Sequence, residues 1–500
     1  MRRYHCLLPL FTLALTLAGC APQGATGPTP APTTSAPLAV DPTSAPPTAS
    51  APTRVPATVA PTNAPPTLAP TLAPTTAPPT LAPTSAPTLA PTSAPTLAPT
   101  SAPTLNAEQI FFLRGGDLVA LDVGAGNVEL LVEGVREVAA TRDARRLILV
   151  RGDGVAGELW VLERSSGSLW QLTQNTRAES TPSWALDGLS LVYSSAPEPR
   201  PFPPDWERWS GWCGSAEARL LDLPATPQLV AASAERSLGP GCEPAFGPDG
   251  KRIVFTTPPT GAGGMPFKGA GNTLRMVNRQ GENGWDMAIA DGVTPEQGQL
   301  VYSPAWSPDG GQISYQRFLG YQALVDINLV EVGSSFQRNG APVGLGAGWM
   351  LAPSFAPDGR QMLITEHNYS DARGLSGYNI WRTTVLRLGA PSQLMLPSGE
   401  LTLGASEAAR LPQATAAAWS PDGAALIVAL PAGWQPGMGD DEPSFAAVGP
   451  GELWRWRVGA APEAKLADGV DFGSPLLWLP AAPGSLSTDA TDFRPIAGRS

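Results

Sequence analysis

Apolar and polar positions alternate with a period of two in six related stretches between residues 138 and 430. The best preserved is PAWSPDGGQISYQR, residues 304–317. It has a ring three residues before Asp309 and apolar residues four and six positions after it. A period of two is typical of β-strands. Pro-Asp-Gly between two such runs favours a tight turn, because proline presets φ and glycine accepts a positive φ. Each stretch therefore predicts two strands joined by a turn.

The other copies keep the same columns. They are PSWALDGLSLVYSS (182–195), PAFGPDGKRIVFTT (244–257), PSFAPDGRQMLITE (353–366), AAWSPDGAALIVAL (417–430) and the degenerate VAATRDARRLILVR (138–151), which lacks the glycine. The ring column holds Trp184, Phe246, Trp306, Phe355 and Trp419. We expect these rings and the aliphatic columns to be buried between neighbouring sheets.

Two further strand-like runs follow each copy, for example residues 157–173, 323–333 and 451–467. Four strands in a repeat of roughly 45–65 residues are typical of propeller blades. Residues 109–132 supply three strands without a first one, and residues 474–480 supply a first strand alone. The sequence therefore predicts an all-β propeller of four-stranded antiparallel blades. A composite blade built from both ends closes a ring of seven, or of six if the last segment is only a clasp.

The repeated (Trp/Phe)-Ser-Pro-Asp-Gly-x-x-(Ile/Leu)-x-(Phe/Tyr) pattern resembles the WD-like repeat of TolB-type propellers over residues 107–482. The resemblance implies a ring of antiparallel sheets that serves as a platform for protein contacts. TolB itself has another N-terminal domain where this chain has a proline-rich segment.

The N-terminus predicts export. Residues 1–19 have two arginines, a short apolar run and a small-residue end, as in a signal peptide. Leu-Ala-Gly-Cys, ending at Cys20, resembles a bacterial lipobox, which implies cleavage before Cys20 and a lipid on its sulfur. An ordinary signal peptide that ends near a cysteine is the alternative. The lipobox predicts an extracytoplasmic protein anchored by lipid to a bacterial membrane or cell surface.

Residues 20–106 are almost entirely Ala, Pro, Thr and Ser. Such a segment buries too little apolar surface to offset the entropy of ordering, so we expect a disordered, extended linker. At about 3.1 Å per residue it reaches well over roughly 100 Å. We interpret it as a stalk that is suited to O-glycosylation, with a proline-rich ligand for a partner domain as the alternative. Residues 483–500 are expected to form a C-terminal tail.

The net charge restricts the possible partners, and the cysteine content indicates a disulfide. The formal net charge is −11 and no basic cluster occurs, so nucleic acid is not an expected partner, and we expect a monomer. Of four cysteines, Cys6 and Cys20 belong to the export signal. Cys213 and Cys242 remain for a disulfide in an oxidising compartment, with two free thiols as the alternative. We expect no metal and no cofactor.

Catalytic motifs are missing from the chain. No GxSxG, HExxH, phosphate-binding loop or dinucleotide fingerprint occurs, and His367 is the one histidine after the signal peptide. We interpret His367 as a polar loop residue rather than a ligand or base. The aspartate column could form a ring of acids, but an aspartate between proline and glycine caps its own turn. The structural-turn aspartates are Asp187, Asp249, Asp309, Asp358 and Asp422.

Insertions beyond the repeat are the candidate binding regions. Residues 197–215 carry Trp206, Trp209 and Trp212 beside Cys213, and residues 431–444 carry Trp434. Rigid aromatic side chains are typical of interfaces and sugar platforms, although a small core around the disulfide would also explain them. The glycine-rich residues 257–272 are expected to be flexible.

We therefore expect a lipid-anchored propeller that acts as a binding platform for protein or glycan and is not an enzyme. An enzyme of lyase or glycosidase type that uses the propeller channel, through paired carboxylates, is the first alternative. A structural envelope protein is the second.

Overall fold

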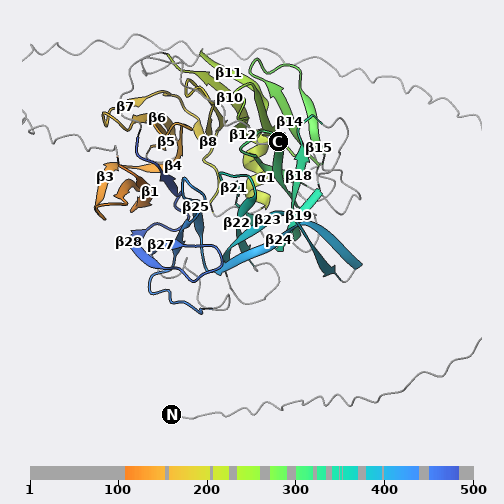
Figure 1. Ribbon diagram of the computed structural model, residues 1–500. Coiled ribbons are helices and arrows are strands. Elements are labelled where there is room, and N and C mark those ends of the chain that lie inside the picture. Colours follow the sequence, from red (N-terminus) through yellow and green to blue (C-terminus); the bar gives the residue numbers. More distant parts are fainter. Residues whose placement is uncertain are drawn as a thin grey trace, which may run out of the picture. The chain divides into compact units, whose positions relative to one another are not determined.

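Seven antiparallel sheets are arranged around a central axis in the computed structural model (Figure 1). The structure describes residues 107–152, 157–202, 206–224, 234–259, 271–289, 300–318, 324–333, 341–347, 349–351, 353–369, 379–396, 399–438 and 450–482. The expected signal peptide, Cys20, the linker and the C-terminal tail lie outside these residues. The prediction of a seven-bladed, all-β propeller is confirmed, and the six-bladed alternative is wrong.

The blades follow one another along the chain, each beginning with its inner strand. The first three are blade 1 with β4 (Val135–Ala140), β5 (Arg146–Arg151), β6 (Glu158–Glu163) and β7 (Leu169–Gln171); blade 2 with β8 (Ala178–Trp184), β9 (Ser190–Ala196), β10 (Glu217–Asp222) and β11 (Glu235–Pro240); and blade 3 with β12 (Cys242–Phe246), β13 (Arg252–Thr256), β14 (Thr273–Asn278) and β15 (Trp285–Ile289).

The remaining blades have the same order, although the inner strand of blade 5 is split in two. They are blade 4 with β16 (Leu300–Trp306), β17 (Gln312–Phe318), β18 (Leu324–Glu331) and β19 (Ala341–Ala347); blade 5 with β20 (Trp349–Met350), β21 (Ser354–Phe355), β22 (Gln361–Tyr369), β23 (Asn379–Leu396) and β24 (Gly399–Pro412); blade 6 with β25 (Ala416–Trp419), β26 (Leu426–Leu430), β27 (Gly451–Trp456) and β28 (Ala464–Val470); and blade 7 with β29 (Leu477–Leu479), β1 (Gln109–Arg114), β2 (Asp117–Asp122) and β3 (Val128–Val132).

Blade 7 joins the two ends of the described chain. Its inner strand β29 pairs antiparallel with β1, so that Phe111 lies opposite Leu477. The orange strand β1 therefore lies beside the blue C-terminal strands in Figure 1. The Ser474 hydroxyl accepts the Leu113 N–H at 2.7 Å, and the Asp471 carboxylate accepts the N–H groups of Gly115 and Gly116. This closure leaves no sheet edge open between the first and last blades.

The ring column connects neighbouring blades. Trp184, Phe246 and Trp419 are buried, and Trp306 and Phe355 are partly buried. The three indole N–H groups donate across the blade boundary, each to an inner-strand carbonyl of the preceding blade: Trp184 to Ala139, Trp306 to Ala245 and Trp419 to Ser354, at 3.1–3.2 Å. The repeat therefore supplies both the apolar core between blades and its hydrogen bonds.

The turn aspartates shape the bends between the first and second strands. In each of the five Asp-Gly copies the aspartate accepts the N–H of the second residue after it, at 2.8–3.0 Å. The following glycine has φ between +63° and +71°. In blade 1 the glycine is replaced by Ala144, which adopts a φ of +57°. We call the end of the ring that carries these turns the turn face.

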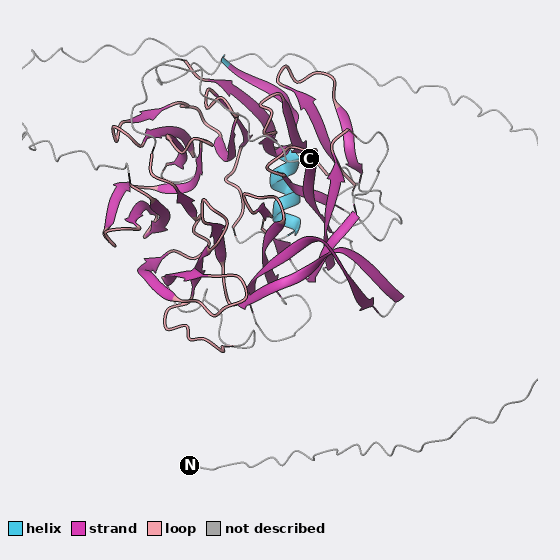
Figure 2. Cartoon of the chain, in the orientation of Figure 1, coloured by secondary structure: helices cyan, strands magenta, loops and turns pink. Residues whose placement is uncertain are grey.

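The opposite end, the loop face, carries the connections between second and third strands. Helix α1 (Trp206–Ser215), cyan in Figure 2, belongs to such a connection in blade 2. This short helix was not expected from the sequence. Most of the glycine-rich insertion of blade 3 and part of residues 431–444 lie outside the described residues. Among the helices that could be described, none is long and apolar enough to cross a membrane.

Candidate functional site

A cavity of about 610 Å³ lies where the inner strands begin, at the loop face. Its walls come from the starts of β4, β8 and β25, from β22, and from the turn before β29. Residues 199–202, which connect β9 to α1, also line it, and we call them the strap. Because the first strands of neighbouring blades contact one another around the axis, this cavity occupies one end of the central channel.

The strap reaches residues of three other blades. Arg200 Nη2 donates to Glu243 Oε1 of β12 at 2.7 Å. The Phe202 ring lies 5.5 Å from the Phe472 ring, in the turn before β29, and 6.4 Å from the Trp381 ring of β23, measured between centroids. A Cβ atom at Gly473 would clash with the Phe202 ring. Glycine at position 473 is therefore what lets the strap pack against blade 7.

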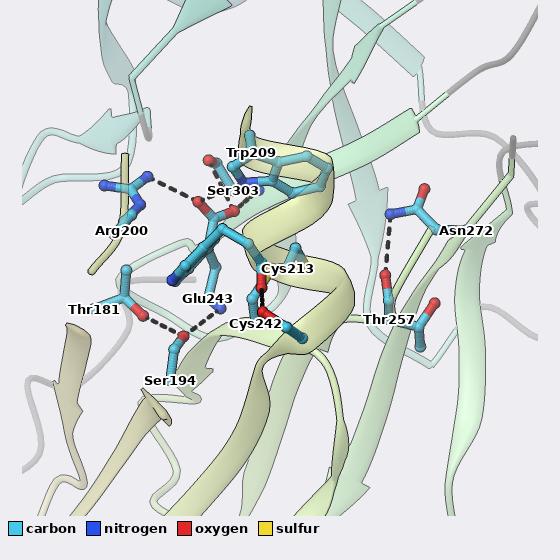
Figure 3. The surroundings of a disulfide bond; sticks show 12 residues. Thr181, Ser194, Arg200, Trp209, Cys213, Cys242, Glu243, Thr257, Asn272 and Ser303 are labelled. Carbon is cyan, nitrogen blue, oxygen red and sulfur yellow. Dashed lines mark hydrogen bonds and ion pairs between the residues drawn. A yellow bond between two sulfur atoms is a disulfide. The ribbon is translucent and has the colours of Figure 1, made fainter. Parts of the chain in front are cut away.

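The Glu243 side chain accepts hydrogen bonds from several residues around it (Figure 3). Its Oε2 accepts the backbone N–H of Ser303 at 2.7 Å and the Ser303 hydroxyl at 3.1 Å. Its Oε1 accepts from Arg200 and, at 3.3 Å, from the Trp209 indole. The side chain of Glu243 is only 6% exposed. A buried carboxylate needs such a set of donors, because an unpaired charge costs several kcal/mol, on the order of 3–5, in a protein interior.

Three neighbouring inner strands carry the same backbone distortion. Thr181, Glu243 and Ser303 have φ between +49° and +53°, and each stands directly before a proline at a β-bulge. The bulge removes their N–H groups from the strand ladder, and Glu137 Oε2 accepts that of Thr181 at 2.6 Å. Positive φ in residues other than glycine is costly and gathers at functional sites. These bulges therefore mark the channel end that holds the cavity.

Burial shifts the titration of the carboxyl groups beside the cavity. It raises the pKa of Glu137, although the positive charge of Arg200 partly opposes the shift. It raises the pKa of Glu179, in β8, to about 8, and the neighbouring carboxylates Glu158 and Glu235 act in the same direction. Burial works against the charge of Arg200, but the carboxylates of Glu243 and Glu137 outweigh it and raise the pKa of Arg200. Glu179 is thus protonated at neutral pH.

The tryptophans that we expected to bind a partner have other roles where they can be described. Trp209 is fully buried and Trp212 is 5% exposed, and both pack in one cluster with Cys213 and Cys242. Trp434 is 4% exposed and its ring lies 5.7 Å from the Trp454 ring. None of these three rings offers a free face. The side chain of Trp206, at the start of α1, lies outside the described residues.

Trp209 and Trp212 are buried together because of the helical period of α1. Positions 209, 212 and 213 lie on one helix face, because side chains three and four residues apart are neighbours. That face turns toward the disulfide between Cys213 and Cys242, which is present with a Cα–Cα distance of 5.2 Å. The predicted disulfide is confirmed. A disulfide persists in oxidising compartments, which agrees with an extracytoplasmic location.

His367 lies in strand β22, opposite Trp381 in the register with β23, and not in a loop as expected. Its side chain lies outside the described residues. Within the part of the chain that the structure describes, no group of three His, Cys, Asp or Glu side chains is placed to hold a metal ion.

Sequence reasoning missed the charged residues of the site, namely Glu137, Glu179, Arg200 and Glu243. One signal was available. The residue before the first position of the repeat is small in blades 2, 4, 5 and 6, but it is Glu137 in blade 1 and Glu243 in blade 3. Charged residues in an otherwise small column indicate bonds that the repeat itself does not need.

The solved structures that resemble this chain share little sequence with it. No family model matches the chain, and no curated protein matches it. Similar solved structures include an oligogalacturonate lyase from Vibrio parahaemolyticus, with 12% identity over 63% of this chain and 80% of that one and a TM-score of 0.43. Others are the periplasmic gluconolactonase of Pseudomonas aeruginosa (13% identity, 75% and 99% coverage, TM-score 0.45) and TolB of Acinetobacter baumannii (11%, 75% and 68%, TM-score 0.36).

These comparisons correct one expectation. We expected that the chain is not an enzyme, and this is contradicted, because a lyase and a lactonase are among the solved structures with this propeller fold. At such identities the likeness concerns the fold alone, so neither activity passes to this chain. The missing catalytic motifs therefore do not separate a binding platform from an enzyme.

Proposed function

We propose that the chain is a lipid-anchored, extracytoplasmic propeller that acts as an interaction platform and binds its ligand in the cavity at the loop face. The observation that carries this proposal is the cavity itself. Its volume of about 610 Å³ falls in the range of roughly 300–1,000 Å³ that is usual for ligand sites. Charged side chains and strained bulges surround it. A second cavity of about 560 Å³ lies at the opposite channel end, where the repeated turns and the rings of Trp184 and Trp306 line it.

The point where the described chain begins supports display of this cavity. The carbonyl of Ala107 accepts Arg164 Nη2 at 3.2 Å, and Arg164 Nη1 donates to the carbonyl of Ala144 in the turn of blade 1. Ala107 therefore lies at the turn face. A linker of residues 20–106 that is anchored at Cys20 would join the propeller at this face and not beside the cavity.

The anchor is tested by Cys20→Ser. We expect the full chain to fractionate with membranes and to carry a lipid mass at its mature N-terminus, and the variant to lose both. Mass spectrometry of the mature N-terminus reads the modification directly. A wild-type chain without lipid and with cleavage elsewhere would refute the anchor while leaving the cavity proposal untouched.

The binding site is tested by filling the cavity. Ala417 lines it, and Ala417→Trp adds a ring there. Leu186→Glu is the matched control, because Leu186 lies in the turn of blade 2 at the other face and is 45% exposed. Native mass spectrometry after incubation with a cell-envelope extract should show bound species on the wild type and the control but not on Ala417→Trp. Loss on the control alone would refute the cavity as the site. Both variants are first checked for cooperative unfolding.

Catalysis on the bound ligand is the second candidate function, and Glu179 is the observation that favours it. A carboxyl group that keeps its proton at neutral pH can act as a general acid, and burial raises the pKa of Glu179 to about 8. It would give its proton to the leaving oxygen as the bond to that oxygen breaks, while water adds its hydroxyl to the other fragment and its remaining proton returns to Glu179. Glu179→Gln should then abolish conversion even at ligand concentrations that saturate the variant, as followed by mass spectrometry of the products. Unchanged conversion would exclude Glu179 as the acid.

A further inference from the structure

We infer that the cavity binds an uncharged, polyhydroxylated ligand, specifically the end of a neutral saccharide, with Glu179, Ser180 and Arg200 as its hydrogen-bonding partners. This inference rests on the proposed function, because it names the class of ligand for the same site. It is argued from the polar atoms that the fold leaves open, from the balance of charge, and from the apolar walls.

Three buried polar atoms at the cavity have no hydrogen-bond partner within the described protein. They are Glu179 Oε2, Ser180 Oγ and Arg200 Nε. Glu179 and Ser180 are each only 2% exposed. Nearly all buried polar groups in folded proteins are paired, so an unpaired set that lines one cavity indicates a ligand that completes it. These are side-chain atoms, so the hydrogen bonds between strands do not satisfy them. Glu179 and Ser180 lie at the start of β8, the inner strand of blade 2, which lines the cavity.

Acidic side chains outnumber basic ones around the cavity, which disfavours an anion: Glu137, Glu179, Glu243 and Asp471 stand against Arg136 and Arg200. Arg136 is not free, because it has an interaction partner of its own. The guanidinium of Arg200 is paired with Glu243 at 2.7 Å. Both oxygens of Asp471 accept backbone N–H groups, and Glu137 Oε2 accepts the N–H of Thr181. A ligand anion would thus enter without a spare cation to compensate it, and burying an unpaired charge is costly.

A cationic ligand is disfavoured for a different reason. The open Nε–H of Arg200 is a donor, and an ammonium group has no lone pair to accept it. A hydroxyl group both donates and accepts. Neighbouring hydroxyls on one sugar ring can therefore accept from Arg200 while they bond to Ser180 and Glu179.

The remaining walls suit the apolar faces of a sugar ring. Val135, Val150 and Leu363 line the cavity together with Phe202 and Phe472. The Phe202 ring is held at the strap and is 41% exposed. Ligand sites are typically apolar with a few polar groups that fix orientation, and this cavity has that composition.

The test measures binding of named probes to the full chain by isothermal titration calorimetry at pH 7. The neutral probes are maltotriose, cellotriose and triacetylchitotriose. Trigalacturonate is the anionic probe and chitosan trimer the cationic one. We expect at least one neutral trisaccharide to bind and the charged probes to bind at least tenfold more weakly.

Variants connect the binding to the three open atoms. Ser180→Ala and Glu179→Gln should each weaken binding of that trisaccharide about tenfold, the effect of one lost hydrogen bond of about 1.4 kcal/mol. Ser314→Ala and Glu163→Gln are the controls. Ser314 is buried in β17, Glu163 is paired with Arg146, and neither lines the cavity. They should leave the affinity unchanged.

The outcomes separate this inference from the proposed function. Tighter binding of trigalacturonate or chitosan trimer, abolished by Ala417→Trp, would overturn the ligand class and support the cavity. Neutral binding that Ser180→Ala and Glu179→Gln leave intact would overturn the assigned partners. Binding by none of the probes would overturn the saccharide inference. The envelope-extract experiment with Ala417→Trp then decides independently whether the cavity binds anything.

Discussion

The turn face and the loop face are built from the same blades but by different interactions. At the turn face, each aspartate bonds to a backbone N–H two residues away, and one local solution is repeated around the ring. At the loop face, Arg200, Glu243 and Ser303 come from three blades and meet across tens of residues of sequence. A repeated contact maintains the fold in every blade. Glu243 accepts the Ser303 N–H as Glu137 accepts the Thr181 N–H, so this bond occurs twice. The ion pair of Arg200 with Glu243 has no counterpart in the other described blades. A buried ion pair that occurs once costs desolvation of charge and indicates a role that the fold alone does not require.

The largest effect should follow from breaking the loop-face network. Glu243→Gln leaves the buried guanidinium of Arg200 without its partner, which typically costs about 3–5 kcal/mol in the free energy of unfolding. Glu407→Gln is the control, because Glu407 pairs with Arg410 at a half-exposed site and such pairs contribute about 0–1 kcal/mol. Urea denaturation measures both. Equal losses would show that the two ion pairs are equivalent and would remove the contrast between the faces.

The next largest loss of stability should follow from removing the disulfide that connects α1 to β12 beside Glu243. Cys213 and Cys242 are 29 residues apart, and a loop of that length corresponds to about 3–4 kcal/mol in the chain-entropy description. The Cys213→Ser/Cys242→Ser double variant should lose that much stability to urea. Adding reductant should destabilise the wild type to the same level and leave the variant unchanged. A wild type that is indifferent to reductant under unfolding conditions would contradict this expectation.

The contrast also shows which parts of the molecule can be predicted from sequence. The sequence predicts the strands, the seven blades and the Asp309 turn, because each depends on residues within about ten positions of one another along the chain. Six copies of the repeat make the common pattern recognisable even where one copy departs from it. The strap depends on pairs such as Arg200 with Glu243 that no local period specifies. Trp209 and Trp212 were interpreted as candidate binding residues, with a small core around the disulfide as the alternative, and they form that core. Their i, i+3 spacing, together with Cys213, was the signal for a helix with one buried face.

Titration of Glu179 should change the free energy of unfolding by a smaller amount, and this change depends on pH. Its carboxyl has a folded-state pKa of about 8 against an ordinary value of 4.5. Between these values the unfolded chain releases the proton and the folded chain keeps it, so the free energy of unfolding falls as pH rises from 4.5 to about 8. Glu179→Gln removes this contribution.

The variant should therefore gain stability relative to the wild type between pH 5 and pH 8, on the order of 2 kcal/mol, since each unit of pKa difference corresponds to about 1.4 kcal/mol and relaxation around the charge reduces the total. Urea denaturation at several pH values gives the difference between the two proteins. Asp309→Asn is the turn-face control. The pKa of Asp309 lies below its ordinary value through bonds from Ser307 and Gly311, so the stability that it contributes is constant at neutral pH and is lost only as the pH falls into the acid range. Parallel curves for wild type and Glu179→Gln would contradict the assignment.

The smallest effect concerns the glycine column of the turn face. Gly310 has a φ of +71°, and Ala144 takes a φ of +57° at the equivalent position of blade 1. An L-residue pays about 1–2 kcal/mol in the left-handed region, and glycine recovers most of it while it loses about 0.5–1 kcal/mol of chain entropy. Gly310→Ala should therefore destabilise the domain by about 1 kcal/mol, and Ala144→Gly should stabilise it by about 0.5 kcal/mol. Thermal unfolding measures both shifts. Opposite signs at two sites of one column would show that the turn face follows a single local rule, and shifts of the same sign would show that blade 1 has a turn of its own.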